Sequence, residues 1–466
     1  MKSKHIDQNS MTQSGFIAAI DLGTHSIKGV VGRKNENNVV SIITSGEQPS
    51  NNCIRRGMVY NIEETGANVK RLITMLENSM GRKIGKVYVA LGGQSLRTME
   101  FARSIELSPG EMVLEEVIGR LHASAEQFVP ELARAYAVAD VEYFVDGKSE
   151  RKPVGVTGSR VEANFKLITG RPNLLGNVEK SITGKAGLPI EQHIVGALAA
   201  AAATLSDEEK ELGCALVDFG AGTTTLSVYK GGILRSVIVI PFGGKSITRD
   251  IRALNFTEND AEQLKIKYGK AMKKQETPFL ASPFSEKPDV DMTELNRVIE
   301  MRLDEITANL KEQIKLSGYE GESLGAGLII TGGASQLENL DDYLEQKLKM
   351  SVRRATVKKT LVNNAPELVN DPSYSRVLGM LLLGDEDCEQ KEEEAPKEYE
   401  EYEKEMEQDT STGRTSWIFR DNKKTKKPKS QKEKEKEKEK EKEKDGGGFF
   451  SSMENFFGNM FLEEDE

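Results

Sequence analysis

The 466-residue chain contains only three cysteines, Cys53, Cys214 and Cys388, and they lie far apart in the sequence. An odd, widely spaced set forms neither a disulfide framework nor a cysteine metal cluster, which favours a reducing compartment such as the cytoplasm. The N-terminus has no apolar signal core, and the longest run of small apolar residues (196–205) is half the length of a membrane span. We therefore expect neither a secretion signal nor a transmembrane helix.

A net charge of −10 argues against a general nucleic-acid binder, because such proteins neutralise phosphates with excess Lys and Arg. Charged residues make up 30% of the chain and concentrate after Gly384, where acidic and basic stretches lead into strict Lys-Glu alternation from Lys432 to Lys444. In a helix this alternation places like charges four residues apart. The composition therefore predicts a solvated, disordered charged linker over 386–446.

Hydrophobic periodicity divides the remainder of the chain. It predicts three strands over 16–45, a helix over 63–80, and three further strands over 214–240. Residues 84–170 read as a small strand-and-helix unit of their own, and the alanine-rich run as a tightly packed helix. A chain of this length suits two to four domains or subdomains.

One turn sequence occurs twice at a fixed offset. Aligning "IAAIDLGTHSIKGVVGR" with "CALVDFGAGTTTLSVYK" superposes Asp21 on Asp218 and Gly23 on Gly220. A single Asp-x-Gly is usually an ordinary hairpin turn, but two copies at one offset indicate two halves of similar topology that face each other. No P-loop sequence is present, so any phosphate site must use a different device.

Glycine and hydroxyl residues at a hairpin tip can present N–H and O–H donors to a phosphate, because glycine removes the Cβ barrier and tolerates positive φ. Phosphate would repel the two aspartates, so we expect Asp21 and Asp218 to hold Mg²⁺ through water. A third glycine turn, Thr331–Gln336, follows a strand and is expected on the adenosine side of the cleft. The predicted ATP-binding residues are Asp21, Gly23, Thr24, Ser26, Lys28, Asp218, Gly220, Gly222, Thr223, Thr224, Gly332, Gly333 and Ala334.

These motifs and their order resemble the actin-like ATPase superfamily, and within it the FtsA family of cell-division proteins. "AAIDLGTHSIK" and "LVDFGAGTTTLSVY" resemble its phosphate motifs, and "LIITGGASQLENL" resembles its adenosine motif. The resemblance implies a two-lobed α/β fold with an inserted small α+β subdomain, a disordered charged linker and a C-terminal amphipathic helix. The implied segments are an N-terminal extension (1–15), lobe I (16–83 and 171–205), the inserted subdomain (84–170), lobe II (206–385), the linker (386–446) and the terminal helix (447–466).

The same resemblance implies an ATP-binding protein that polymerises and tethers FtsZ filaments to the cytoplasmic membrane. Such a protein is peripheral on the cytoplasmic face at the division septum, and is primarily an adaptor and at most a slow ATPase. Its partners would be the FtsZ C-terminal peptide, other copies of itself, other division proteins and membrane lipids, with no nucleic acid. Two alternatives stay open: an actin-like ATPase of a pilus or shape-determining assembly, and a sugar-kinase-type phosphotransferase.

Further residues are assigned by the resemblance alone. Glu262 and Lys265 would approach the nucleoside. Gln192 or Glu191 would orient the attacking water at the start of the helix that connects the lobes, which includes the alanine-rich run (196–205). A polar residue near a helix start explains Gln192 equally well. The FtsZ peptide would be received by Arg297, Arg302 and Glu305, although ion pairs along a solvated helix explain these residues too.

The last residues predict an amphipathic helix that binds a membrane surface. Large apolar side chains fall on one side of a helical wheel, while polar residues such as Ser451 and Ser452 fill the other. Acidic residues at the very end would weaken attachment to an anionic surface, and a partner's groove is the rival binding site. The predicted lipid contacts are Phe449, Phe450, Met453, Phe456, Phe457, Met460 and Phe461.

Overall fold

The computed structural model of this chain describes residues 15–272, 291–319, 323–359, 362 and 364–390. Nearly all of the predicted N-terminal extension, most of the predicted linker and the whole predicted terminal helix lie outside these residues. The seven predicted lipid contacts therefore lie outside them too. Within the described part, no helix is both long enough and apolar enough to cross a bilayer.

Lobe I is built on a five-stranded sheet with the order β11-β6-β1-β2-β3. Its strands are β1 (Ile17–Leu22), β2 (Ser26–Lys34), β3 (Val40–Pro49), β6 (Val87–Leu91) and β11 (Ile190–Val195). β1 pairs antiparallel with β2 and parallel with β6. All six residues of β1 are buried, as expected for a central strand that is covered on both faces.

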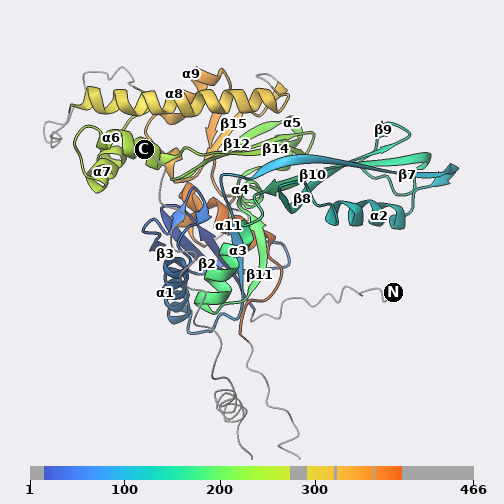
Figure 1. The fold of residues 1–466 in the computed structure, drawn as a ribbon, viewed down its shortest axis with the longest axis horizontal. Helices are drawn as coiled ribbons and strands as arrows, with labels where there is room; N and C mark the ends of the chain where they lie inside the picture. Colours follow the sequence, from blue (N-terminus) through green and yellow to red (C-terminus); the bar gives the residue numbers. More distant parts are fainter. Residues whose placement is uncertain (1–14, 273–290, 320–322, 360–361, 363, 391–466) are drawn as a thin grey trace, which may run out of the picture. The chain divides into compact units, whose positions relative to one another are not determined.

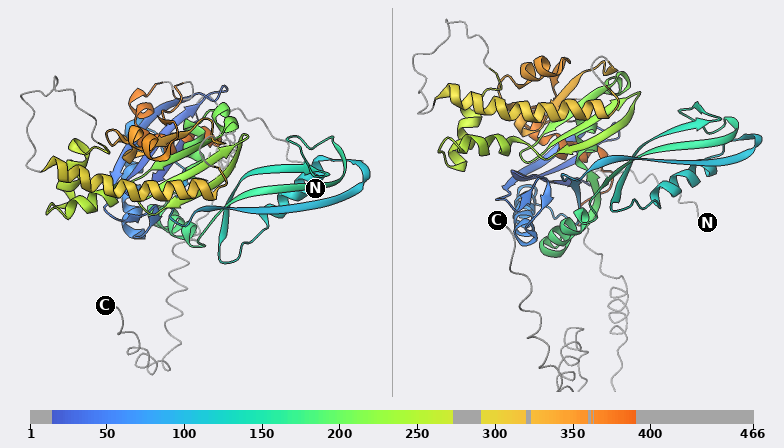
Figure 2. Two further views of the ribbon diagram at one scale, coloured as in Figure 1. Left: turned by 90° about the horizontal axis from the view of Figure 1, so that it is seen from above. Right: turned by 45° about the horizontal axis from the view of Figure 1, so that its top comes forward.

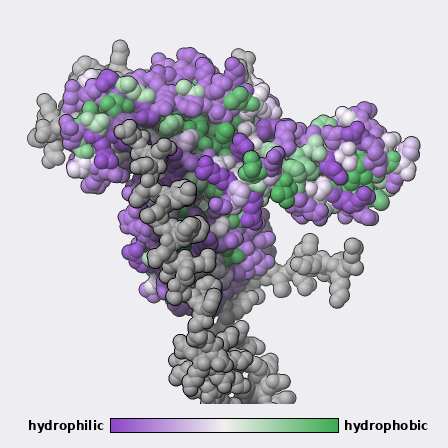
Figure 3. Space-filling model, viewed as in Figure 1, coloured by the Kyte–Doolittle hydropathy of each residue, from purple (hydrophilic) through white to green (hydrophobic). Residues whose placement is uncertain are grey.

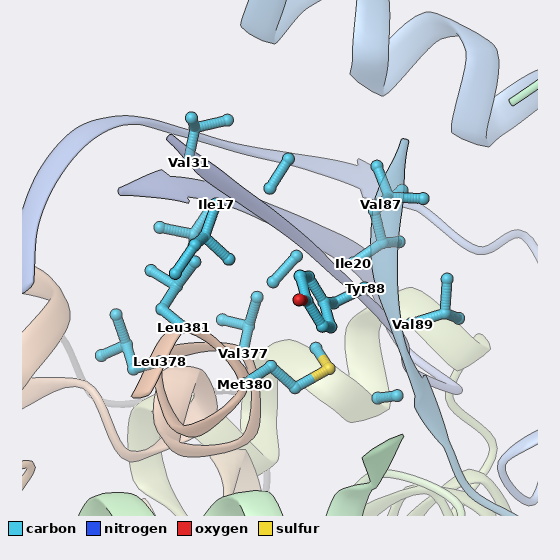
Figure 4. Close-up of a cluster of buried hydrophobic side chains, with 14 of the residues drawn as sticks. Ile17, Ile20, Val31, Val87, Tyr88, Val89, Val377, Leu378, Met380 and Leu381 are labelled. Atoms are coloured by element: carbon cyan, nitrogen blue, oxygen red, sulfur yellow. The ribbon is translucent and has the colours of Figure 1, made fainter. Parts of the chain in front are cut away.

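Helices cover the faces of this sheet. α11 (Ser375–Leu383) packs on one face, where Figure 4 shows Val377 and Leu381 directed at the strands. α1 (Ile62–Met80) packs against β2 and β3 and has the predicted boundaries to within one residue. The short α3 (Leu174–Glu179) continues as a π-helix, Lys180–Ala186, which ends at Gly187 with a left-handed φ of 75°. A glycine in this left-handed conformation is a common helix terminator.

Lobe II is built on the first five strands of a nine-stranded sheet, whose order is β16-β15-β12-β13-β14-β7-β10-β8-β9. The lobe II strands are β12 (Cys214–Phe219), β13 (Thr224–Lys230), β14 (Ile233–Ile240), β15 (Leu328–Thr331) and β16 (Val352–Arg354). Its helices are α5 (Asp207–Leu212), α6 (Gly244–Arg252), α7 (Glu258–Tyr268), α8 (Met292–Leu316) and α9 (Leu340–Leu348) (Figure 1).

Short elements complete the described chain. They are β4 (Ile54–Arg55), β5 (Met58–Val59), the 3₁₀ turns Gly333–Gln336 and Pro372–Tyr374, and α10 (Pro366–Asn370). The alanine-rich run forms α4 (Gly196–Thr204), which packs against α11. A Cβ at Gly379 of α11 would lie 1.8 Å from the carbonyl oxygen of Ala199, so the two helices are in backbone contact. The tight packing predicted for this run is confirmed.

The remaining four strands, β7 (Arg97–Met112), β8 (Arg134–Val145), β9 (Lys148–Ser149) and β10 (Thr157–Gly170), form an insert together with α2 (Glu115–Glu126). Figure 2 shows these strands running on from the lobe II sheet. The insert has a small apolar core of its own around Leu121 and Phe165.

The insert joins lobe II through β14 and not as a separate sheet. Ile238 pairs with Arg97, and the backbone N–H of Leu234 donates to Asp140 at 2.8 Å. The sheets also place the start of the insert at Arg97, later than the expected boundary at residue 84, because β6 belongs to lobe I. Long-range strand pairing of this kind has no local sequence signal.

The segment after Gly384 begins as part of the body. Cys388 is fully buried and its backbone N–H donates to the Phe16 carbonyl oxygen at 2.8 Å. Arg82 Nε donates to Glu389 Oε1 at 2.6 Å, and the N–H of Gln390 donates to the Lys83 carbonyl. The expected start of the linker at residue 386 is therefore too early, since backbone pairing holds the chain to lobe I through residue 390.

Candidate functional site

A cavity of about 440 Å³ opens where the β1–β2 turn, the β12–β13 turn and the turn after β15 meet. Every predicted nucleotide-binding residue except Thr224 lines this cavity. Three segments that lie far apart in the sequence thus line one cavity. The arrangement follows from topology, because Asp218 of β12 pairs with Thr331 of β15 and brings the second and third turns together.

The two repeated hairpins use glycine for the same reason. A Cβ at Gly23 would lie 2.5 Å from the carbonyl oxygen of Ser26, and one at Gly220 would lie 2.9 Å from that of Thr223. In both turns the carbonyl three residues later folds back on the glycine, which no side chain permits. The sequence repeat is therefore also a repeat of backbone geometry.

The hairpin tips approach each other at Gly222. A Cβ at this position would meet Thr24 Oγ1 of lobe I at 2.6 Å. The third turn is equally close, since Gly332 has a φ of 88° and its Cβ would lie 2.3 Å from Asp218 Oδ1. Glycine is required at both positions to let the walls of the cavity come together.

Thr224 does not face the cavity. Its side chain is fully buried, and its hydroxyl donates to the carbonyl oxygen of Phe242 at 2.8 Å. This bond holds the loop that leads into α6, and the loop in turn donates from Gly244 to the Gly220 carbonyl at 3.0 Å and from Lys245 to the Ala221 carbonyl at 2.8 Å. Thr224 therefore lies away from the predicted phosphate site, and its hydroxyl instead holds the loop that leads into α6.

Lys245 is a cavity residue that sequence reasoning missed. Its Nζ donates to the Thr24 carbonyl oxygen and to Asn52 Oδ1, both at 3.2 Å and both in lobe I. The signal available in the sequence was the Gly-Gly-Lys run at 243–245, directly after a strand. Its importance depends on contacts across the cleft, which the local sequence does not reveal.

Lys28 and Lys265 line the cavity, but each already has an acidic partner. Lys28 Nζ lies 3.0 Å from Glu47 Oε2 and 3.9 Å from the centre of the Tyr374 ring. Lys265 Nζ lies 2.7 Å from Glu262 Oε2. Burial lowers the pKa of Lys265 and is only partly offset by Glu262, whereas Lys265 and Thr248 hold the pKa of Glu262 low against the opposing effect of burial.

The two motif aspartates share a positive neighbour that was not predicted. Arg376 of α11 lines the cavity, and its Nε lies 2.5 Å from Asp218 Oδ2. Burial alone would lower the pKa of Arg376, but Asp218 and Asp21 raise it overall. Burial raises the pKa of Asp21, and Arg376 opposes that effect.

This donor set does not fit a hydrated Mg²⁺ held by Asp21 and Asp218. One oxygen of Asp218 is bonded to the guanidinium and the other lies against Gly332. A guanidinium repels a nearby metal cation, and a water of the hydrated ion would have to displace it to reach Asp218 Oδ2. The expected magnesium site thus conflicts with the position of Arg376.

Glu191 and Gln192 lie in β11 and not at the start of a helix, and neither lines the cavity. Glu191 pairs with Lys86 at 2.8 Å. The helix begins only at Gly196, because residues 190–195 extend to pair in parallel with β6. The expectation that these two residues orient an attacking water therefore has no support in the geometry. His193 is half-buried in the same strand, where burial lowers its pKa.

Comparison with known proteins identifies the family. Residues 215–379 match the family model for the cell division protein FtsA. The chain is 38% identical over 330 residues to the cell division protein FtsA of Porphyromonas gingivalis, covering 69% of this chain and 68% of that relative. It is 30% identical over 380 residues to that of Pseudomonas aeruginosa, covering 80% and 90%. The chain belongs to the FtsA family.

The predicted family and fold class are thus confirmed. A solved structure of the PilM-PilN type IV pilus biogenesis complex has a TM-score of 0.55 to this FtsA-family chain at 19% identity, covering 79% of this chain and 98% of that one. At such identity the likeness shows the fold alone. The cell-division role follows from the family.

The predicted partner-binding residues of this FtsA-family chain lie on α8, in two different settings. Arg297 is exposed and pairs with Glu294 at 2.6 Å. Arg302 is largely covered and donates to both oxygens of Asp250 in α6, at 2.5 and 3.0 Å, as well as to Glu305. Arg302 thus ties two helices of lobe II together, whereas Arg297, Glu305 and Met301, 59% exposed, are accessible on α8.

Proposed function

We propose that this FtsA-family protein binds ATP in the cleft between its lobes, polymerises, and tethers FtsZ filaments to the cytoplasmic membrane at the division septum. In this role it is an adaptor on the cytoplasmic face of the membrane, and slow ATP hydrolysis would be secondary. FtsZ, other copies of the chain, other division proteins and lipids are its proposed partners.

The observation that carries the proposal is the convergence of the two hairpins and the third glycine turn on one cavity. The glycines at 23, 220 and 222 leave backbone exposed at the hairpin tips, where N–H groups can reach a polyphosphate. Residues 332–334 and the Glu262–Lys265 pair line the same cavity and are proposed to receive the adenosine. Because both lobes contribute, a bound nucleotide would couple their positions.

Polymerisation is proposed to use the insert. Its surface carries large exposed apolar side chains, which on a soluble body commonly mark contact surfaces. In Figure 3 hydrophobic patches lie over these strands, among otherwise hydrophilic residues. The exposed apolar residues of the insert are Met112, Leu114, Val129, Leu132, Val138 and Val154.

Tethering is proposed to use two separate segments of the chain, one for FtsZ and one for the membrane. The exposed face of α8 around Arg297 would receive the C-terminal peptide of FtsZ, and the apolar residues at 449–461 would enter the lipid interface. Attachment through a short helix is weak for one copy and becomes strong when many copies act together in a filament.

The test is reconstitution with the full chain, lipid vesicles and FtsZ. With ATP present, FtsZ should float with vesicles only when this protein is added, and omission of ATP should reduce the recovery. If FtsZ stayed in the soluble fraction under all conditions, the tethering role would be refuted. ATP binding measured on the same sample separates a failure of the cleft from a failure of the tether.

A further inference from the structure

The side chain of Arg376 follows a narrow path from lobe I to lobe II. It starts on α11 and passes Gly196 and Gly92, where added Cβ atoms would lie 3.3 Å from Arg376 Cδ and 3.9 Å from its Nη1. It ends on Asp218, 158 residues away in the sequence. Only at Gly196 would a Cβ crowd this side chain, since 3.9 Å at Gly92 is an ordinary van der Waals distance.

The aspartates at the end of this path need a positive partner. Asp21 is 8% exposed and Asp218 is 5% exposed, so both carboxylates are largely removed from water and their charges repel each other. Lys28, the other cation beside Asp21, is paired with Glu47 and stacked on Tyr374. Arg376 bonds directly to Asp218, and its charge also lowers the pKa of Asp21 against the effect of burial.

We propose that Arg376 supplies from within the chain the positive charge that a hydrated Mg²⁺ would otherwise bring to Asp21 and Asp218, so that nucleotide binding in this cleft depends little on divalent cations. A guanidinium is permanently charged and presents several N–H donors, so the groups not bonded to Asp218 remain available to a phosphate oxygen or a water. This inference rests on the proposed ATP-binding function.

The first test measures ATP affinity of the full chain by calorimetry, with Mg²⁺ and with excess EDTA. For the unaltered protein we expect the two dissociation constants to agree within about threefold. Arg376→Gln should bind at least about tenfold more weakly in EDTA and recover most of this loss in Mg²⁺. Arg376→Lys keeps the charge and should stay closer to the unaltered protein. A loss of about tenfold or more on adding EDTA to the unaltered protein would overturn the inference.

The second test needs no nucleotide. Arg376→Gln leaves two buried carboxylates without their guanidinium, so its melting temperature should fall and Mg²⁺ should restore part of it. The unaltered protein should show no such response to Mg²⁺. Arg353→Gln is the matched control, because Arg353 pairs with Glu209 at 2.6 Å outside the cavity, and its melting temperature should not respond to Mg²⁺.

The two tests separate the two proposals. If the unaltered protein bound no ATP with or without Mg²⁺, the proposed function would fail, and the melting experiment would still decide the role of Arg376. Equal stabilisation of the unaltered protein and Arg376→Gln by Mg²⁺, or none of either, would refute that role. If Arg376→Gln did not fold, Arg376→Lys and the EDTA measurement on the unaltered protein would decide.

Discussion

At the scale of single residues, the cleft depends on positions where no side chain fits. Gly222 is the clearest case, because the atom that a Cβ would strike, Thr24 Oγ1, belongs to the opposite lobe. The requirement is therefore not one of backbone conformation but of approach between two hairpins. Substitution there should affect the site more than the fold.

We expect Gly222→Val to weaken ATP binding by at least about tenfold, because the branched side chain forces the hairpin tips apart where the phosphates are proposed to lie. Calorimetric titration with ATP measures the effect, and circular dichroism checks the fold. Gly119→Val is the control, since a Cβ at Gly119 of α2 meets nothing within 4 Å. ATP binding of Gly222→Val at the unaltered affinity would show that the cleft is wrongly assigned.

The two arginines of α8 should separate partner binding from stability. Arg297→Glu reverses an exposed charge, and we expect it to weaken binding of the FtsZ C-terminal peptide at least about fivefold. The melting temperature should change little, because solvent screens an exposed ion pair. Arg302→Ala removes a bidentate link to Asp250 and should lower the melting temperature instead. Fluorescence anisotropy with labelled peptide measures the binding. Undiminished binding by Arg297→Glu would place the peptide elsewhere.

At the scale of elements, the insert is a chain segment whose two ends lie side by side in the sheet. Thr169 of β10 pairs with Arg97 of β7, so the chain leaves and re-enters the body at neighbouring positions. The segment at 385–390, by contrast, does not leave the body: it follows the last helix and forms hydrogen bonds with lobe I. Both can be altered without touching the cavity.

Replacing residues 99–167 with a short turn should leave ATP affinity within about tenfold, or roughly 1.4 kcal/mol, because none of the replaced residues lines the cavity. Self-association, measured by sedimentation with ATP, should be lost. The flanking pair Arg97 and Thr169 is kept so that the junction retains its native register. A folded deletion variant that lost all ATP binding would contradict the separation of the two functions.

The reactivity of the Cys388 thiol reports whether the segment at 385–390 stays packed on lobe I. Burial raises the pKa of its thiol to about 11 and that of Cys214 to about 12, so both should resist alkylation near neutral pH while the native packing lasts. Arg82→Ala removes the ion pair with Glu389 and should speed alkylation of Cys388 severalfold, leaving Cys214 unchanged as the internal control. Mass spectrometry after iodoacetamide labelling measures both sites. Equal acceleration at Cys214 would indicate general loosening instead of local release.

At the scale of the whole molecule, the folded body and the membrane helix are proposed to act as separate units joined by a charged linker. The body carries the cleft, the insert and the face of α8, and the residues at 449–461 are proposed to make the membrane contact. A change confined to one unit should therefore leave the function of the other intact.

Phe456→Glu combined with Phe457→Glu should release the protein from lipid vesicles, because the apolar stripe then carries two charges, while ATP affinity stays unchanged. Vesicle flotation measures the attachment. Ser451→Glu with Ser452→Glu adds the same charge on the polar side of the predicted helix and should release less protein. If the Phe456 and Phe457 variant still floated with the vesicles, the anchor would lie elsewhere.

The sequence by itself determined the features that depend on neighbours along the chain. The paired hairpins could be predicted because the glycine at 23 or 220 must avoid a carbonyl only three residues away, a requirement visible within one short motif. The strands over 16–45 and 214–240 and the helix at 62–80 follow from local periodicity in the same way. The apolar character of α4 likewise predicted its burial.

Tertiary structure decided what depends on distant partners. The bond from Arg376 to Asp218 spans 158 residues, and no local pattern distinguishes this arginine from one on the surface. Pairing with β6 keeps Glu191 and Gln192 in a strand, although polar residues before an alanine run suggest a helix start. Thr224 points inward because β13 pairs with β14 and carries the Phe242 carbonyl to its hydroxyl. In each case the deciding energy comes from a contact formed only when the sheets and helices have assembled, which the order of residues alone does not contain.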